Sequence, residues 1–273
     1  MIPAAPLPKS MLDNHFYYVS WGIKPILFSL GGFNIYAYSF FVTLGLIVGI
    51  LIYYFEAKKQ KKISEQGFFI VFGSLLGAAL GAKILELLIS LPILLSRPSG
   101  IEIILSGKTI IGGLIGGLIG ALITKKILGI KEKRGNLFAP AIAAGVAIGR
   151  LGCFFRGCCY GQPTNLPWGV DFGDNILRHP TQIYESLFML LMFAYLERIK
   201  NKSNIKPGQL FKILMLAYFI FRFFIEFIRV EQIAFAGPTF FQIISLSVII
   251  YLVRLDIQNL FIKLINIWKP KKK

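Results

Sequence analysis

Charged side chains are scarce in this sequence, and acidic ones are scarcer than basic ones. Of the 273 residues, 16% carry charge and 55% are hydrophobic. A soluble domain of this length does not need stretches of about 20 residues almost without charge, whereas a helix must run about that far to cross a bilayer. The sequence therefore predicts an all-α integral membrane protein, and the shortage of acidic residues leaves a net charge of +17 to be explained.

Cysteine and histidine are also rare. The three cysteines, Cys153, Cys158 and Cys159, are clustered and odd in number, which is not the disulfide framework of a small secreted domain. The two histidines are His15 and His179. The first 14 residues contain three prolines and no apolar core, so we expect no cleaved signal peptide. No inverted repeat and no pair of broken helices is evident in the sequence, which argues against a secondary transporter.

Seven apolar stretches have the length of membrane-spanning helices. They cover residues 36–55, 67–94, 109–124, 137–155, 181–197, 209–228 and 239–255. Residues 1–35 precede them as an external and interfacial segment, and residues 256–273 follow as a basic cytoplasmic tail. We predict a single membrane domain over residues 1–273.

The distribution of basic residues predicts the orientation of this domain. Twenty of the 30 lie on one side, in or beside the segments that follow the first, third, fifth and seventh spans, and six lie on the other side. The positive-inside rule then places the N-terminus outside and the C-terminus in the cytoplasm. Membrane topology accounts for most of the net charge, and nucleic-acid binding is not expected.

The remaining basic residues lie within or at the edge of spans, where an unpaired charge is costly. They are Lys83, Arg150, Arg222 and Arg229, and the acidic residues at a similar depth are Glu86, Glu185 and Glu226. With the predicted orientation, all of them fall near the outer leaflet. Either they pair with one another as packing contacts or extend to the membrane interface, or, because cations outnumber acids, they bind an anionic ligand.

Glycine recurs at every fourth residue in two of the spans. Gly73, Gly77 and Gly81 do so in the second span, and Gly112, Gly116 and Gly120 in the third. Ladders of this kind let membrane helices pack backbone to backbone, so we predict close helix packing here and assign these glycines no chemistry.

The sixth span carries a polar stripe. Tyr218, Arg222, Glu226 and Arg229 recur at i, i+4, i+8 and i+11, which is one face of a helix. Guanidinium groups that face a cavity suit a phosphate, because the planar fork binds two oxygens at once. Arg150, at the outer end of the fourth span, would complete the clamp. Since phospholipid phosphates lie at this depth, a phospholipid is the expected ligand.

Two further clusters carry chemistry. His179 opens the fifth span and shares roughly one face with Gln182 and Glu185; it either accepts a proton or hydrogen-bonds the start of the helix. The cysteines either form a disulfide, remain buried thiols, or present a reactive thiol beside Arg150 or Arg156. Their C-x4-C-C spacing is not a standard zinc spacing, so we expect no metal and no cofactor.

In these features the chain resembles the prolipoprotein diacylglyceryl transferases of bacterial membranes, from Pro25 to about the seventh span. The segments that carry the resemblance are Tyr38, Gly112-Gly113-Leu-Ile-Gly116, the Gly149-Arg150-Leu-Gly152…Gly161 signature, His179-Pro-Thr-Gln-Ile-Tyr-Glu185, Arg222-Phe-Phe-Ile-Glu226-Phe-Ile-Arg229 and Gly237-Pro-Thr-Phe-Phe-Gln242. Seven spans with an external N-terminus are also what that family has.

The resemblance implies a multi-pass enzyme of the bacterial cytoplasmic (inner) membrane. It would transfer the diacylglyceryl group of phosphatidylglycerol to the lipobox cysteine of a prolipoprotein signal peptide and release glycerol 1-phosphate, with membrane lipids as its other partners. Arg150 and Arg222 match the family's essential pair and would bind the phosphate together with Arg229. The residues expected to support them are Glu226, Glu185, Gln182, Lys83 and Glu86. Those expected to act in catalysis are Arg222, His179 and Tyr38.

The chain also departs from that family. The family has a histidine, often assigned as the general base, immediately before the Gly-Gly pair of the third span, where this chain has Ile111. Within the signature, two asparagines and a glutamate of the family are replaced by Cys153, Arg156 and Cys158. Two alternatives therefore stay open: a related lipid transferase with another acceptor or with a cysteine as a direct participant, and a non-catalytic phospholipid-binding membrane protein.

Overall fold

The computed structural model describes residues 22–96, 109–202, 204–230 and 237–268. Within these ranges, side chains are described except at residue 90 and at residues 92–96 and 255–268. The predictions for residues 1–21, including the absence of a cleaved signal peptide, lie outside the described residues, as do those for residues 269–273.

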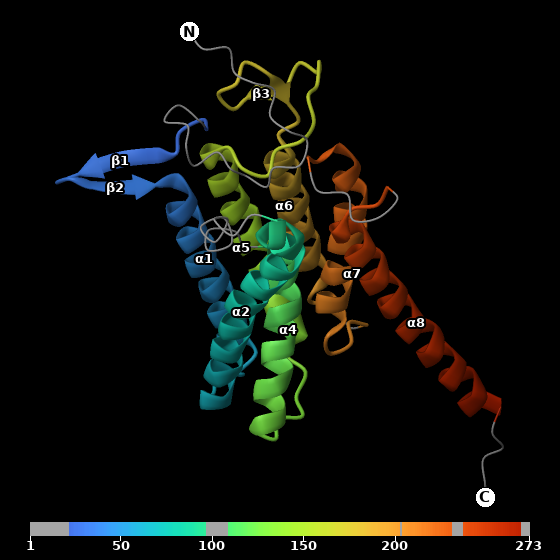
Figure 1. Cartoon of the computed structure of the whole chain (residues 1–273). Coiled ribbons are helices and arrows are strands. Elements are labelled where there is room, and N and C mark those ends of the chain that lie inside the picture. The colour runs from blue at the N-terminus through green and yellow to red at the C-terminus, as the bar shows by residue number, and fades with distance from the viewer. Residues whose placement is uncertain (1–21, 97–108, 203, 231–236, 269–273) are drawn as a thin grey trace, which may run out of the picture.

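Helices dominate the described part of the chain (Figure 1). They are α1 (Ala37–Lys59), α2 (Glu65–Ser96), α4 (Ile110–Ile127), α5 (Gly135–Arg156), α6 (Thr181–Ile199), α7 (Gln209–Ile225), which a 3-10 turn (Glu226–Ile228) extends, and α8 (Phe240–Trp268). One of them coincides with each apolar stretch of the sequence, and α8 continues past the predicted end at residue 255. Four are long and apolar enough to cross a membrane: α1, the Glu65–Ile89 part of α2, α4 and α5.

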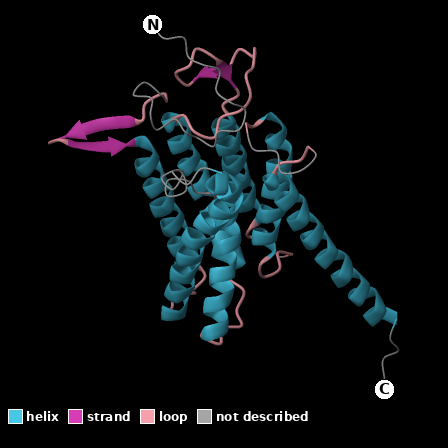
Figure 2. Cartoon of the chain, in the orientation of Figure 1, coloured by secondary structure: helices cyan, strands magenta, loops and turns pink. Residues whose placement is uncertain are grey.

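Two small antiparallel hairpins lie at the same end of the helical bundle (Figure 2). In the first, β1 (Ile26–Leu30) pairs with β2 (Phe33–Tyr36) through a turn at Gly31 and Gly32, whose φ angles of +53° and +86° favour glycine. Its Leu30 and Phe33 side chains are 64% and 81% exposed, and the hairpin projects sideways from the bundle. The second hairpin pairs β3 (Val170–Asp171) with β4 (Leu177–Arg178).

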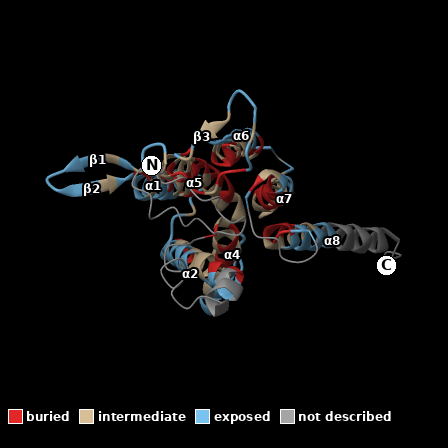
Figure 3. Ribbon diagram, turned by 45° about the horizontal axis from the view of Figure 1, so that its top comes forward, coloured by how far each residue is buried: buried red, intermediate tan, exposed pale blue. Residues whose placement is uncertain are grey.

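The hydrophobic core is built around α5, which packs against α1, α6 and α7. Small side chains of α5 at Ala139, Ala143 and Ala147 are buried, and they allow Met189 of α6 and Leu214 of α7 to pack closely on this helix. Viewed from the hairpin end, the buried residues gather on the helices around α5, while the outer faces of α1 and α2 are exposed (Figure 3). Exposed apolar faces of this kind suit a lipid environment.

The glycine ladders of α2 and α4 face each other. A Cβ atom added at Gly77 would lie 2.3 Å from the carbonyl oxygen of Gly116, and one added at Gly81 would lie 2.4 Å from that of Gly112. Contacts this short never occur between a real Cβ atom and a backbone oxygen, so the two backbones touch where a side chain would separate them. The prediction that these ladders mediate close packing is confirmed.

The basic loops meet at the bundle end opposite the hairpins. The guanidinium group of Arg134, before α5, donates to the carbonyl oxygen of Lys62, after α1, at 3.0 Å. The amide of Asn136 donates to the carbonyl oxygen of Lys206, before α7, at 3.0 Å. These bonds place the loops after α1, α4 and α6 on one side, as the charge distribution requires.

Replacing Gly77 with alanine tests the helix contact. We expect Gly77→Ala to destabilise the protein by about 1–3 kcal/mol, because the new methyl group overpacks a backbone contact. Gly113→Ala is the matched control, since its Cβ atom would meet nothing closer than 3.7 Å. Thermal unfolding of the detergent-solubilised protein measures both variants; equal stability of the two would refute the contact.

Candidate functional site

A chain of buried charges links α5, α6 and α7 near the hairpin end of the bundle. Arg150 of α5 forms an ion pair with Glu185 of α6, with Nη2 and Oε2 2.5 Å apart. Arg222 of α7 lies 3.9 Å from the same carboxylate and pairs at 3.0 Å with Glu226, and Nε of Arg229 lies 3.7 Å from Glu226. The polar stripe predicted for the sixth span therefore meets the predicted arginine of the fourth.

Neighbouring side chains hold the two carboxylates in place. Tyr218 donates its hydroxyl hydrogen to Oε1 of Glu185 at 3.0 Å, and Thr239 donates to Oε1 of Glu226 at 3.1 Å. The guanidinium carbon of Arg222 lies 4.9 Å from the ring centroid of Phe241, within the range of a cation–π contact. The network thus also draws in the start of α8.

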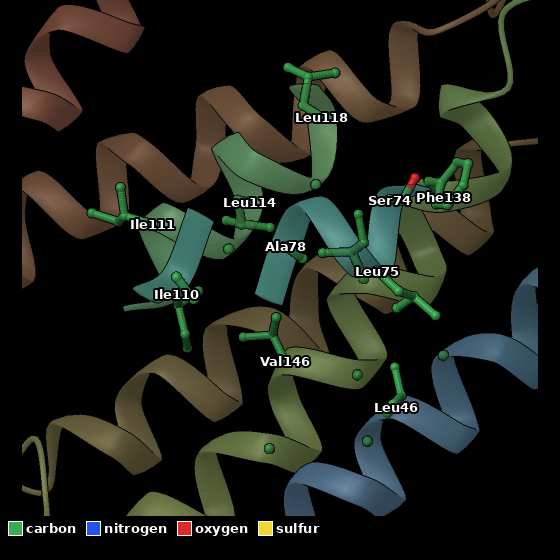
Figure 4. Close-up of a pocket in the computed structure, with 18 of the residues that line it drawn as sticks. Leu46, Ser74, Leu75, Ala78, Ile110, Ile111, Leu114, Leu118, Phe138 and Val146 are labelled. Carbon is green, nitrogen blue, oxygen red and sulfur yellow. The ribbon is translucent and has the colours of Figure 1, made fainter. Parts of the chain in front are cut away.

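A cavity of about 740 Å³ opens beside this network. It lies between the α1–α5 pair and the α2–α4 pair, and its walls are mostly apolar; Leu46, Ala78, Leu114 and Val146 are among the side chains that face it (Figure 4). Among cavities of this size and lining, those that hold a ligand bury most of its apolar surface and orient it by a few polar groups.

The charges that reach this cavity are mainly positive. Arg150, Arg222, Arg229 and Arg156 all line it near the hairpin end, whereas Glu185 and Glu226 do not. The two carboxylates therefore stand behind the guanidinium groups and orient them toward the cavity. Among these network residues, three arginines against two glutamates leave a formal excess of one positive charge. An anionic group with apolar chains matches this arrangement.

The three cysteines come together at the C-terminal end of α5, with Cys153 in its last turn and the other two just past it. Their sulfur atoms all lie within 4.8 Å of one another, no disulfide joins them, and all three line the cavity. Cys153 and Cys158 are buried, and Nη1 of Arg150 lies 3.9 Å from the sulfur of Cys153. Hydrogen bonds from the Cys153 and Cys158 thiols, helped by Arg229 and Arg150, hold the pKa of Cys159 well below its usual range.

The residues at the start of α6 point in different directions. The side chain of Gln182 is buried and donates to the carbonyl oxygen of Cys158 at 2.6 Å. The ring of His179 contacts the hydroxyl of Tyr184, with Nδ1 and Oη 3.3 Å apart, and that hydroxyl accepts from Trp168 at 2.8 Å. His179 is not among the described residues that line the cavity. The structure thus brings Gln182 to the cysteines and Glu185 to the arginines, whereas the ring of His179 meets Tyr184.

Of the other predicted site residues, Tyr38 and Glu86 line the cavity, whereas Lys83 is not among the described lining residues. Tyr38 of α1 lines the cavity, and its ring lies 5.1 Å from the guanidinium carbon of Arg156. Glu86 of α2 is buried and lines the cavity, while Lys83 lies one turn earlier on that helix and is absent from the described lining. Ile111 is buried and lines the cavity as an apolar group.

Sequence reasoning missed the role of Thr239. Its backbone N–H donates to Oε1 of Gln242 at 2.9 Å, and its side-chain oxygen accepts from the backbone N–H of Gln242 at 3.2 Å. This reciprocal pair is a capping box at the start of α8. The T-x-x-Q spacing at Thr239–Gln242, directly after Gly237 and Pro238, was the signal that would have revealed it.

Neutralising Glu185 tests the charge network. We expect Glu185→Gln to destabilise the protein by about 3–5 kcal/mol, because it leaves two buried arginines without their shared carboxylate. Tyr218→Phe removes one hydrogen bond to that carboxylate and should cost less, about 1.5–3 kcal/mol. Thermal unfolding in detergent compares them; a Glu185→Gln protein as stable as Tyr218→Phe would contradict the network.

Comparison with known proteins finds one family, both in a family profile and in individual relatives. The family profile described as prolipoprotein diacylglyceryl transferase matches residues 25–257. A protein of Clostridium tetani named phosphatidylglycerol–prolipoprotein diacylglyceryl transferase is 34% identical over 214 residues, which are 76% of this chain and 86% of that protein. Proteins with the same name from Finegoldia magna and from Wolbachia pipientis wMel are 34% and 33% identical, over 85% and 76% of this chain and 94% and 82% of their own.

The matched region contains the helices from α1 to α7, the arginine network and the cysteine cluster. The resemblance seen in the sequence is therefore confirmed: the chain belongs to the prolipoprotein diacylglyceryl transferase family.

Proposed function

We propose that this protein transfers the diacylglyceryl group of phosphatidylglycerol to the cysteine thiol of a prolipoprotein. One observation carries the proposal: buried guanidinium groups from α5 and α7 line an apolar cavity with their paired carboxylates behind them. The names of the relatives agree, since they specify this donor and this acceptor.

The cavity suits the donor lipid in two parts. The apolar walls between the two helix pairs would hold the acyl chains, and the arginines at the hairpin end of the cavity would bind the phosphate. Arg150 and Arg222 share Glu185, so both guanidinium groups are fixed before the ligand arrives. Preplaced cations need no reorganisation when negative charge develops, and this makes them effective in catalysis.

The reaction would be a substitution at carbon. The acceptor thiolate attacks the carbon of the diacylglyceryl group that carries the phosphate. A carbon–sulfur bond forms, and the bond from that carbon to the phosphate oxygen breaks. Glycerol 1-phosphate leaves with the electron pair, and Arg150, Arg222 and Arg229 would stabilise the charge on its phosphate. Tyr38, at the cavity wall, and His179, just before α6, are the proposed residues for proton transfer, with Gln182, Lys83 and Glu86 in support.

We propose a membrane arrangement of seven spans for the whole chain, with the N-terminus outside and the C-terminus in the cytoplasm. The loops after α1, α4 and α6 with their adjoining helix ends, together with the C-terminal region, carry 20 of the 30 basic residues and would face the cytoplasm. The arginine network at the other end would then lie near the outer leaflet of the bacterial cytoplasmic membrane, at the depth of lipid phosphates. A single membrane domain over residues 1–273 fits this arrangement.

Truncating Arg222 tests phosphate binding. We expect Arg222→Ala to lower peptide-dependent release of glycerol phosphate from phosphatidylglycerol by at least about 100-fold, because a preplaced cation is lost. Arg222→Lys should recover little, since a single ammonium cannot reproduce the two-oxygen fork. Arg254→Ala, an exposed arginine of α8, is the matched control. An Arg222→Ala protein that inserts in the membrane and keeps normal activity would refute the clamp.

Replacing His179 separates a chemical role from a structural one. We expect His179→Gln to lower kcat by about 100-fold while changing the KM for phosphatidylglycerol little, because His179 is not among the described residues that line the cavity with the arginines. Tyr184→Phe, which removes the hydroxyl partner of the ring, is the control for local packing. Equal effects of His179→Gln on kcat and KM would assign His179 a structural role.

A further inference from the structure

The cysteine cluster has the dimensions of a metal site. A cation about 2.3 Å from each of three sulfur atoms places those atoms roughly 3.8–4.0 Å apart. The sulfur atoms of Cys153, Cys158 and Cys159 already lie within 4.8 Å of one another, so each separation would have to shorten by about 1 Å at most. Their sequence spacing hid this, because α5 ends at Gly157, between the first ligand and the other two.

The backbone is shaped to make the three sulfur atoms converge. Gly157 ends α5 in the left-handed conformation, at φ +75°, which lets the N–H of Cys158 donate to the carbonyl oxygen of Cys153 at 3.1 Å. Cys159 is itself left-handed, at φ +62°, which is uncommon for a residue with a side chain and costs free energy. Strain of this kind points to a function for the side chain that it positions.

Residues from distant elements anchor the two later cysteines. Gln182 donates to the carbonyl oxygen of Cys158 at 2.6 Å, while Thr181, at 2.6 Å, and Arg229, at 3.0 Å, donate to that of Cys159. In metal sites, such partners of the ligand residues fix the ligands in position before the metal arrives. Here they immobilise two of the three ligands through their peptide groups.

The charges around the cluster suit an anionic metal–thiolate centre. Three thiolates and one divalent cation carry a net charge of −1, and a fourth thiolate would make it −2. Arg150 lies 3.9 Å from the sulfur of Cys153, and Arg229 is bonded to the peptide of Cys159. These arginines would stabilise a negative centre and repel an isolated, ligand-free cation.

The proposed reaction also needs the acceptor thiol to ionise, after which Tyr38 and His179, proposed above for proton transfer, would carry the proton away. Among the described residues that line the cavity, none is a histidine, and Glu86 is the one carboxylate. Glu185 and Glu226 are committed to arginines. A bound cation is an alternative to a general base, because a thiol that coordinates a metal loses its proton.

We propose that Cys153, Cys158 and Cys159 bind Zn²⁺, and that the fourth coordination position takes the thiol of the incoming acceptor cysteine. This inference rests on the proposed transfer function. Three protein ligands with an open fourth position are the pattern of catalytic zinc sites, whereas structural sites are closed by four. The open position would face the cavity that holds the donor.

On coordination, the acceptor thiol releases its proton to water, and its sulfur stays bound to Zn²⁺ as a thiolate. The thiolate attacks the glyceryl carbon, the carbon–oxygen bond to phosphate breaks, and glycerol 1-phosphate leaves against the arginines. The thioether product is a weak, neutral ligand, so it departs and water or the next thiol takes its position.

Metal binding is tested on the full-length protein in detergent, reduced and stripped with a chelator. Zn²⁺ or Co²⁺ alone is the probe, and we expect one equivalent to bind, with the sulfur-to-metal charge-transfer bands of thiolate ligation for Co²⁺. Gln182→Leu removes a hydrogen bond that positions Cys158 and should weaken Zn²⁺ binding by ~10–100-fold. Cys153→Ser, Cys158→Ser and Cys159→Ser each remove a ligand atom and should weaken Zn²⁺ binding more than that. Phe154→Leu, beside Cys153 but without a ligand atom, is the matched control. Unchanged binding in the serine variants, or a disulfide in the protein as purified, would overturn the site.

The fourth ligand is tested by X-ray absorption at the zinc edge. We expect three sulfur neighbours at about 2.3 Å without peptide and four with a lipobox peptide, but three with the same peptide carrying serine in place of cysteine. We also expect chelation to abolish transfer and Zn²⁺ to restore it. Peptide-dependent release of glycerol phosphate by metal-free protein would overturn this inference and leave the proposed function intact. Four-sulfur coordination without any release would support the site and refute the transfer function.

Discussion

The rest of the structure depends on the ionic contacts that the Glu185 carboxylate makes with Arg150 and Arg222. This carboxylate neutralises Arg150 of α5 and approaches Arg222 of α7, and Glu226 then links Arg222 to Arg229. An arginine within a membrane helix is costly unless an acid meets it, so this alternation of charges fixes where three helices must cross. The small residues of α5 and the glycines of α2 and α4 permit close packing, but the ion pairs determine its register.

The same alternation divides the site into a back and a front. The carboxylates occupy the back, where Tyr218 and Thr239 hydrogen-bond them, and the guanidinium groups face the cavity. Orientation from behind turns the guanidinium groups toward the cavity. The cysteines line the same part of the cavity, so thiols and guanidinium groups from one short stretch and from α7 meet there.

Much of this arrangement was predictable from the sequence, because it depends on local patterns. Helix positions follow from the length of apolar stretches, and the polar stripe from Tyr218 to Arg229 follows from helical spacing. The glycine ladders predicted close packing for the same reason. In the described part of the chain a helix lies at each of the seven predicted stretches, and α1, the Glu65–Ile89 part of α2, α4 and α5 are long and apolar enough to cross a membrane.

What the sequence could not predict depends on turns and long-range contacts. The convergence of the three sulfur atoms requires left-handed conformations at Gly157 and Cys159 and anchors 24 and 70 residues away along the chain, at Gln182 and Arg229. The direction of the His179 ring depends on the course of the loop that carries Trp168.

Thr239 links a helix end to the site, and this limits how the position can change in evolution. Its hydroxyl caps α8 and also bonds Glu226, so a substitution that loses the hydroxyl alters helix and site together. Serine can replace it, whereas the isosteric valine cannot, and the two features must evolve as one.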